Sequence, residues 1–175
     1  MTLKNHTKDL HKEIEQTPFA QTLIKGTVSV QTYYTYLSYY KKLYELLETH
    51  TDLYKPIESV KRYPAIIKDL NELNFTYEPI TDLSVLSYMD YLTSIKDIKK
   101  LKSHIYVRYM GDINGGQILK QRLSYLPTNL YDFDNIESLK LKLKDFFIDA
   151  DENEARKAFV YNISIYRNLG TIDYD

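Results

Sequence analysis

The amino-acid sequence predicts an all-α protein that folds as one domain. Apolar residues recur at intervals of three and four along most of the chain, which is the spacing of helices with one buried face. Segments that alternate β-branched with polar residues, as strands do, are scarce. The 175 residues suffice for one hydrophobic core, and no linker, repeat or low-complexity tract divides them. We therefore expect a single-domain helical bundle over residues 1–175.

Capping residues and helix breakers mark the boundaries in the first part of the chain. A first helix is expected over residues 2–15, and Pro18 separates it from a short second helix. Gly26 ends this second helix, because glycine readily adopts the left-handed conformation found just after a helix. Ser29 is a typical N-cap residue, and it precedes a long helix that runs to about His50.

Prolines also divide the rest of the chain. Pro56 and Pro64 interrupt the pattern after the long helix, which indicates a linking stretch. The remaining helices are expected over residues 64–74, 82–97, 99–125, 135–149 and 151–169. A turn at 75–79 and a loop around Pro127 and Asn129 separate some of them.

The composition excludes several classes of protein. Lys and Arg (23) nearly balance Asp and Glu (24), so no basic surface for nucleic acid is expected. The chain has no cysteine, which excludes disulfides, thiolate metal sites and iron–sulfur clusters held by cysteine. The N-terminus has no apolar signal segment, and no run of about 18 apolar residues could span a membrane. These features favour a soluble, cytoplasmic protein, in the host cytoplasm if the source is a virus.

Three of the five glycines lie within six residues, inside the helix expected over 99–125. Gly111, Gly115 and Gly116 each cost a helix about 1 kcal/mol relative to alanine, so their concentration needs a reason. One interpretation is a helix–loop–helix turn or a close crossing of two helices. The other is a kinked helix whose bare backbone lies against a flat ligand, with Asp112 as the polar group of the site.

The first helix places charged and apolar residues on two neighbouring stripes. The charged stripe consists of Lys4, Lys8, His11 and Glu15. The apolar stripe, which would face the core, consists of Leu3, Thr7, Leu10 and Ile14. A lone histidine on a helix is usually solvated or satisfied in the core, and lysines often form a simple charged face. His11 also suits an axial metal ligand beside an anionic cofactor, with Glu15 able to accept the second imidazole N–H.

Three segments of the sequence resemble the haem oxygenase family. Residues 7–11, Thr-Lys-Asp-Leu-His, followed by Glu15 and Phe19, are similar to the family's proximal helix. Residues 106–120, Tyr-Val-Arg-Tyr-Met-Gly-Asp-Ile-Asn-Gly-Gly-Gln-Ile-Leu-Lys, resemble its distal-helix signature Tyr-x-Arg-Tyr-Leu-Gly-Asp-Leu-Ser-Gly-Gly-Gln. Residues 158–162, Ala-Phe-Val-Tyr-Asn, resemble its Ala-Phe-x-x-Asn stretch. The resemblance follows the order of the whole chain.

The resemblance implies a bundle in which haem b lies between a proximal helix and a kinked distal helix. His11 corresponds to the ligand of the haem iron, with Glu15 beside it. The distal glycines that let the backbone approach the porphyrin correspond to Gly111, Gly115 and Gly116. The distal network of side chains and water corresponds to Asp112, Arg108 and Tyr44. Residues near the propionates correspond to Lys4, Tyr106, Lys140 and Lys144, and distal lining residues correspond to Phe159 and Asn162.

Two positions and the length depart from the family pattern. Asn114 replaces the serine of the signature, which is a change from one polar side chain to another. Lys144 stands where an arginine is common, and an ammonium lacks the bidentate fork of a guanidinium, so it would hold a propionate less rigidly. The chain is also short and ends soon after Tyr174, as in the family's soluble members.

The resemblance also implies the reaction, in which O₂ opens haem to biliverdin, by default the IXα isomer, with release of CO and Fe²⁺. The electrons would come from a partner, either ferredoxin or a flavodoxin or reductase. Two other functions stay open: a haem-binding or storage protein with little turnover, and a helical oxidoreductase of related fold that acts on another small ligand. The presence of both His11 and Asp112 distinguishes a haem oxygenase from these two alternatives. A storage protein needs no such carboxylate, and a relative that does not bind haem needs no axial histidine.

Overall fold

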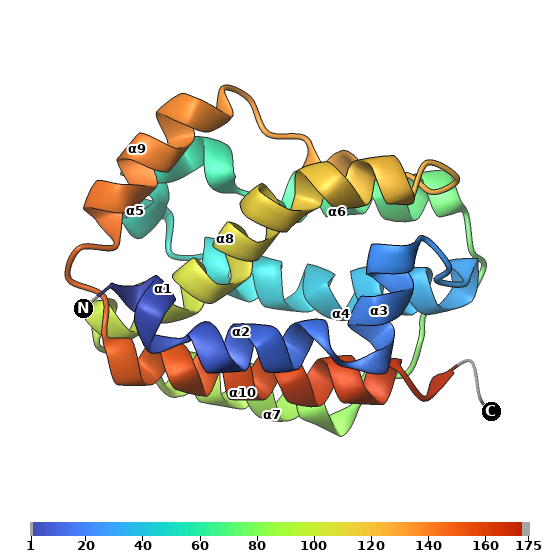
Figure 1. The fold of residues 1–175 in the computed structure, drawn as a ribbon, viewed down its shortest axis with the longest axis horizontal. Helices are drawn as coiled ribbons and strands as arrows, with labels where there is room; N and C mark the ends of the chain where they lie inside the picture. Colours follow the sequence, from blue (N-terminus) through green and yellow to red (C-terminus); the bar gives the residue numbers. More distant parts are fainter. Residues whose placement is uncertain (1, 173–175) are drawn as a thin grey trace.

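The computed structural model describes residues 2–172, and within them it contains helices and connecting loops but no strand (Figure 1). The all-α prediction is confirmed. In chain order the elements are α1 (Leu3–His6), α2 (Lys8–Glu15), α3 (Pro18–Lys25), α4 (Val30–Glu48), α5 (Thr51–Tyr54), η1 (Lys55–Val60), α6 (Tyr63–Leu73), α7 (Leu83–Ser94), α8 (Ile98–Arg122), η2 (Asn129–Tyr131), α9 (Ile136–Phe146) and α10 (Glu152–Leu169). Tyr174 lies outside the described residues. Among those described, none of the helices is long and apolar enough to cross a membrane.

The predicted ends of α3 and α4 form at the residues that signalled them. The Ser29 hydroxyl accepts a hydrogen bond from the Thr32 backbone N–H at 3.1 Å. Gly26 adopts a φ of +69° after α3, and a β-carbon there would lie 2.6 Å from the carbonyl oxygen of Arg122. Glycine is therefore required at this position, both by the backbone conformation and by the close approach of α8.

The first helix is interrupted, so the expectation of one helix over 2–15 is wrong. Thr7 separates α1 from α2 with a φ of −115° and a ψ of 8°. Its hydroxyl donates to the Leu3 carbonyl at 2.8 Å, a local bond that competes with regular helix geometry and leaves no trace in apolar periodicity. Because of this break, Lys4 lies on a separate helical turn from His11.

Helix α4 runs through the centre of the molecule (Figure 1). It carries a row of buried tyrosines. Tyr33, Tyr36, Tyr40 and Tyr44 follow one another at intervals of three or four residues, so they share one side of the helix. Successive ring centroids in this row lie 6.0, 5.0 and 6.4 Å apart. The row fills the core with aromatic rings and also brings hydroxyl groups into it, and each of these needs a polar partner.

Ion pairs hold α2 along α10, the red helix beside it in Figure 1. The Arg156 guanidinium donates to both carboxylate oxygens of Asp9, at 2.8 and 2.9 Å, and this lowers the pKa of Asp9 to about 2. Arg167 and Glu13 form a second pair at 2.8 Å. Leu10, on the inner side of α2, joins a small apolar cluster with α8 and α10. His11, next to Leu10 in α2, remains more than half exposed.

Helix α8 passes through the glycine cluster without interruption, so the helix–loop–helix interpretation is wrong. Among the described glycines a positive φ occurs at Gly26, and the cluster over 111–116 keeps the right-handed helical conformation. In Figure 1 the helix changes direction between its yellow-green beginning and its gold end. The glycines therefore allow one long helix to bend and to make close contacts with its surroundings.

Candidate functional site

Arg108 and Asp112 lie one turn apart on the inner side of α8. The Arg108 Nη2 atom is 3.3 Å from the Asp112 Oδ1 atom. The Tyr44 hydroxyl of α4 donates a hydrogen bond to the other carboxylate oxygen, Oδ2. Asp112 is 2% exposed, so this carboxylate is paired deep in the protein. The three side chains of the expected distal network are thus in direct contact.

Asn162 extends this network from α10. Its amide nitrogen donates to the Ala158 carbonyl at 2.8 Å, which turns its amide oxygen toward α4 and α8. That oxygen accepts hydrogen bonds from the Tyr40 hydroxyl at 2.8 Å and from Arg108 Nη1 at 3.3 Å. The Arg108 Nε atom is buried and has no hydrogen-bond partner among the described residues. Three helices therefore meet at the Arg108 guanidinium.

Burial controls the acidity of the Asp112 carboxyl. Removal from water raises the pKa of Asp112, although the charge of Arg108 and the hydrogen bond from Tyr44 act in the opposite direction. A carboxyl with a raised pKa exchanges protons with nearby water more readily at neutral pH than an exposed aspartate does. Asp112 is therefore suited to hold a water molecule and to move a proton.

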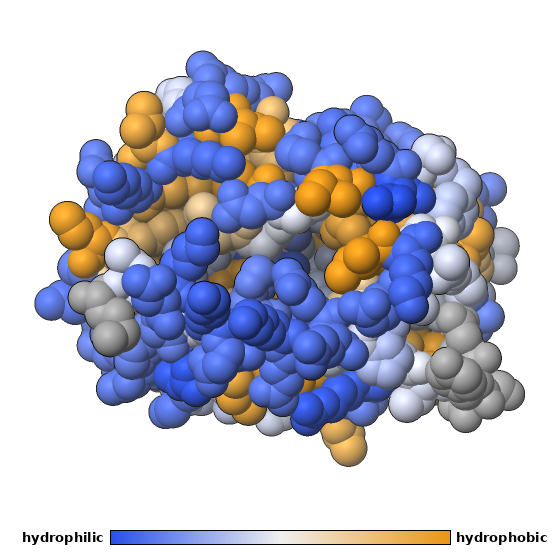
Figure 2. Space-filling model, in the orientation of Figure 1, coloured by the Kyte–Doolittle hydropathy of each residue, from blue (hydrophilic) through white to orange (hydrophobic). Residues whose placement is uncertain are grey.

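A cavity of about 450 Å³ opens between α1, α8 and α9. Four of the predicted residues line it together: Lys4, Tyr106, Lys140 and Lys144. Apolar side chains such as Leu143 and Phe147 form much of its wall, and Figure 2 shows apolar surface between hydrophilic rims near α9. Because three lysines and one acid, Glu152, line the cavity, it favours an apolar ligand with an anionic edge.

The three glycines of α8 have different surroundings. A β-carbon on Gly115 would meet none of the described atoms within 4 Å, and one on Gly111 would meet Arg108 Nη2 at 4.0 Å. A β-carbon on Gly116 would lie 2.6 Å from the Tyr131 ring. We therefore correct the expectation for Gly116, because its α-carbon packs on a core tyrosine of η2. Gly111 and Gly115 are the glycines that leave space beside the helix.

The His11 imidazole of α2 is exposed and therefore accessible to a ligand. The side chain is 58% exposed, and its Nε2 atom lies 3.4 Å from Glu15 Oε1. The imidazole meets the Phe159 ring edge-on, with the ring centroids 6.2 Å apart. Phe159 therefore lies beside His11, whereas we expected it on the distal side with Asn162. The proximity of Glu15 is the contact that a tautomer-fixing role requires.

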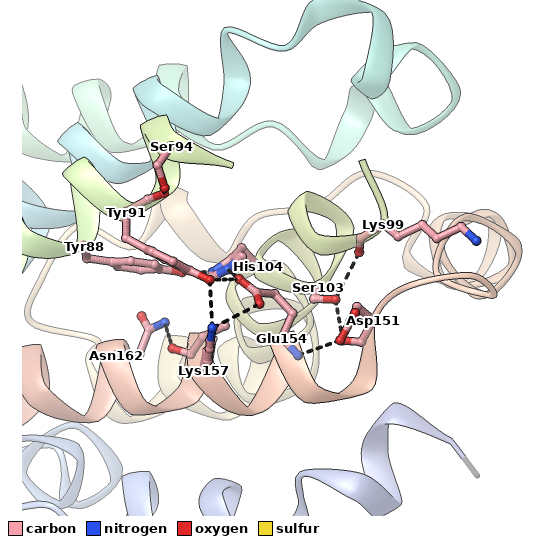
Figure 3. A network of polar contacts seen from close by, with 11 residues as sticks. Tyr88, Tyr91, Ser94, Lys99, Ser103, His104, Asp151, Glu154, Lys157 and Asn162 are labelled. Carbon is pink, nitrogen blue, oxygen red and sulfur yellow. Dashed lines mark hydrogen bonds and ion pairs between the residues drawn. The ribbon is translucent and has the colours of Figure 1, made fainter. Parts of the chain in front are cut away.

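A second buried network, not anticipated from the sequence, joins α7, α8 and α10 (Figure 3). His104 Nδ1 lies 2.7 Å from the Tyr88 hydroxyl, and its Nε2 lies 3.0 Å from Glu154 Oε1. A carboxylate only accepts hydrogen bonds, so Nε2 carries the proton and Tyr88 donates to Nδ1. Burial lowers the pKa of His104. The sequence spacing could have indicated His104 as a site residue, since His104 precedes Arg108 by one helical turn and Arg108 precedes Asp112 by one turn.

These features fit the haem that the sequence resemblance implies. An exposed imidazole can coordinate iron, and lysine ammonium groups can bind propionates. The open space beside Gly115 admits a planar ring close to the helix backbone. The buried, unpartnered Nε of Arg108 is a donor that a water molecule near Asp112 could satisfy.

Comparisons with known proteins agree with this assignment. Residues 1–168 match the family model described as Heme oxygenase. The chain is 31% identical to a heme oxygenase of Guillardia theta, over 95% of this chain and 84% of that protein. It is 29% identical to heme oxygenase 2 of Mus musculus over 95% of this chain, but it spans only 64% of the length of that relative.

Solved structures share the fold. The structure of heme oxygenase from Leptospira interrogans aligns with a TM-score of 0.83 at 24% identity, covering 95% of this chain and 97% of that one. Heme oxygenase-1 from Synechocystis, solved in complex with heme, aligns with a TM-score of 0.83 at 23% identity, covering 95% and 90% of the two chains. At these identities the likeness establishes the fold alone.

Proposed function

Because the chain belongs to the haem oxygenase family, we propose that it degrades haem with O₂ to biliverdin, CO and Fe²⁺. The observation that carries the proposal is that helix α8 holds a buried carboxylate, Asp112, together with two features suited to haem. These are the open space beside Gly115 and Tyr106, which lines the cavity that also contains Lys4, Lys140 and Lys144. Haem b is the substrate, and its iron supplies the chemistry that activates O₂. The residues of this chain bind haem, orient it and manage protons.

Binding uses two sets of residues. His11 would hold the iron through a ring nitrogen, and Glu15, whose Oε1 lies 3.4 Å from His11 Nε2, would accept an imidazole N–H and so fix the tautomer. Lys4, Lys140 and Lys144 bind the propionates together with the Tyr106 side chain. These contacts set the rotation of haem in its own plane, and this rotation selects the carbon bridge that is opened. The IXα isomer of biliverdin is the product we propose.

Proton management falls to Asp112 and its partners. The Asp112 carboxylate holds a water molecule on the side of α8 where haem binds and acts through it. Its raised pKa allows it to release a proton to this water and to take one up again. Arg108 and Tyr44 fix the two carboxylate oxygens in place. Gly111 and Gly115 let the planar ligand lie close to the helix, since neither carries a side chain into that space.

Electrons come from an external donor. The chain has no cysteine to hold an iron–sulfur cluster of its own. We propose a ferredoxin as this donor, or else a flavodoxin or a reductase, and we propose that the protein works in the cytoplasm, in that of the host if the source is a virus.

The test follows haem after it is added to the purified protein. We expect one haem per chain and, with reduced ferredoxin and O₂, conversion of the haem absorption bands to those of biliverdin. CO is trapped with ferrous myoglobin, and Fe²⁺ is measured with a coloured chelator. Stable haem that persists through reduction would instead identify a binding or storage protein. Failure to bind haem would leave a helical oxidoreductase that acts on another small ligand.

A further inference from the structure

We propose that Tyr40 is a positioning residue that holds the Arg108 guanidinium against Asp112. Tyr40 lies on α4 one turn before Tyr44, and its side chain is fully buried. It belongs to no motif in the sequence. The effect of Tyr40 on haem cleavage rests on the proposed function. The effect of Tyr40 on the Arg108–Asp112 pair does not depend on that function.

The first contact is made by the Tyr40 ring. The Arg108 Cζ atom lies 4.3 Å from the centroid of this ring, compared with 6.0 Å from the ring of Tyr44. A buried guanidinium needs partners for its flat faces as well as for its N–H groups, and an aromatic face attracts it electrostatically. Because Arg108 Nε has no hydrogen-bond partner among the described residues, the ring contact matters more for its position.

The second contact is made by the Tyr40 hydroxyl. It donates at 2.8 Å to Asn162 Oδ1, the same oxygen that accepts from Arg108 Nη1 at 3.3 Å. The Asn162 amide cannot turn away, since its nitrogen is held by the Ala158 carbonyl. Tyr40 therefore constrains Arg108 from its face directly and from its edge through Asn162.

This arrangement predicts how Asp112 responds when Tyr40 changes. Removing the ring opens a void beneath Arg108, so the guanidinium can tilt away and its positive charge stabilises the carboxylate less. The proton affinity of Asp112 then rises. The charged and titratable groups that act on this pair, besides Arg108 and Asp112 themselves, come from α4, α7, η2, α10 and the residues before α6. They are Tyr33, Tyr36, Tyr40, Tyr44, Tyr88, Tyr131, Tyr166 and Arg62.

The experiment titrates Asp112 in the haem-free, full-length protein by NMR, with ¹³C-labelled aspartate carboxyls and the Asp112→Asn spectrum as the assignment. Tyr40→Leu should raise the proton affinity of Asp112 by at least about tenfold, which is one pKa unit. Tyr40→Phe keeps the ring and loses one hydrogen bond, so a smaller rise of about threefold is expected. Tyr39→Phe is the matched control, because Tyr39 is a buried tyrosine of the same helix whose hydroxyl donates to the Ile80 carbonyl at 3.1 Å rather than to Asn162.

An unchanged Asp112 titration in folded Tyr40→Leu overturns the proposal. If Tyr40→Leu does not fold, the comparison of Tyr40→Phe with Tyr39→Phe decides, and equal Asp112 titrations in these two variants overturn the proposal as well. A wild-type protein that does not cleave haem, with Asp112 still responding to Tyr40, would refute the proposed function and leave the positioning role intact.

Discussion

The Tyr44 hydroxyl donates a hydrogen bond to the Asp112 carboxylate across 68 positions of sequence, and both side chains are buried. This bond ties α4 to α8 at the point where the glycine cluster begins. The carboxylate thus depends for its position on the packing of two helices, as well as on Arg108 one turn earlier in its own helix.

Removal of the Asp112 carboxyl should abolish product formation without abolishing haem binding. Asp112→Ala takes away the group that holds water and moves protons, whose contribution to such reactions is on the order of 10²–10⁴-fold. Biliverdin formed in a single turnover is compared in wild type, Asp112→Ala and Asp90→Ala, an exposed aspartate on α7 as control. A wild-type yield from Asp112→Ala would remove this residue from the mechanism.

Loss of the His11 imidazole should change the coordination of haem iron. His11→Ala should lose the ferric absorption spectrum of the wild-type complex, and added imidazole should restore it by occupying the vacated space. His50→Ala, which changes another exposed histidine, should keep the wild-type spectrum. Unaltered Soret and visible bands in His11→Ala would mean that another group ligates the iron.

The cavity lysines should control which isomer is formed more than they control affinity. Single substitutions of Lys140 or Lys144 should weaken haem binding by about 1 kcal/mol or less, as is usual for exposed ion pairs. Reversing both charges with Lys140→Glu and Lys144→Glu should yield mixed biliverdin isomers, separable by chromatography. The control pair Lys96→Glu and Lys142→Glu has the same change in net charge outside the cavity lining. One unchanged isomer from both pairs would contradict the assignment.

Two neighbouring glycines should respond to alanine in opposite ways. Gly116→Ala should lower the free energy of unfolding by about 1–3 kcal/mol, because its β-carbon would overlap the Tyr131 ring. Gly115→Ala should raise it by about 0.5–1 kcal/mol in the haem-free protein, since the β-carbon meets open space within a helix. The same alanine should weaken haem binding. Denaturant melts and haem titrations of both variants test this, and equal effects on stability would refute it.

His104 should make stability depend on pH below about 6.5. Burial lowers the pKa of His104 in the folded protein below its ordinary value of 6.5, so the unfolded chain takes up a proton that the folded one does not. This contribution to stability is complete above pH 6.5 and is lost as the pH falls, with a slope of up to about 1.4 kcal/mol per pH unit. His104→Gln should flatten the curve between pH 7 and 5.

The comparison with His104→Gln separates the histidine from the buried carboxyls that do not contact it, whereas Glu154, its hydrogen-bond partner, titrates as part of the same pair. Burial raises the pKa of Asp112, Glu48 and Asp69, so these carboxyls make the folded protein more stable as the pH falls, which opposes the effect of His104. They act in the same way in wild type and in His104→Gln. The free energies of unfolding are measured by urea denaturation at each pH. Parallel curves for wild type and His104→Gln would show that His104 titrates alike in the folded and unfolded states.

The sequence by itself determined the features that depend on local spacing. Ser29 and Gly26 mark helix ends because capping involves only a few neighbouring residues. The apolar stripe of α2 and the concentration of glycines in α8 are also visible in the sequence, since helical periodicity places such residues on one side. The break at Thr7 was missed because a single side-chain hydrogen bond, rather than the pattern, interrupts the helix.

Only the tertiary structure showed which further tyrosines and acids lie beside the site residues that the sequence predicted. The chain has 18 tyrosines, and nothing local distinguishes Tyr40, beneath Arg108, from its neighbours. The His104–Glu154 bond and the reason for glycine at 116 likewise depend on contacts between elements distant in the sequence. The physical reason is that burial and hydrogen bonding are settled when helices pack, whereas spacing only says which side of its own helix a residue occupies.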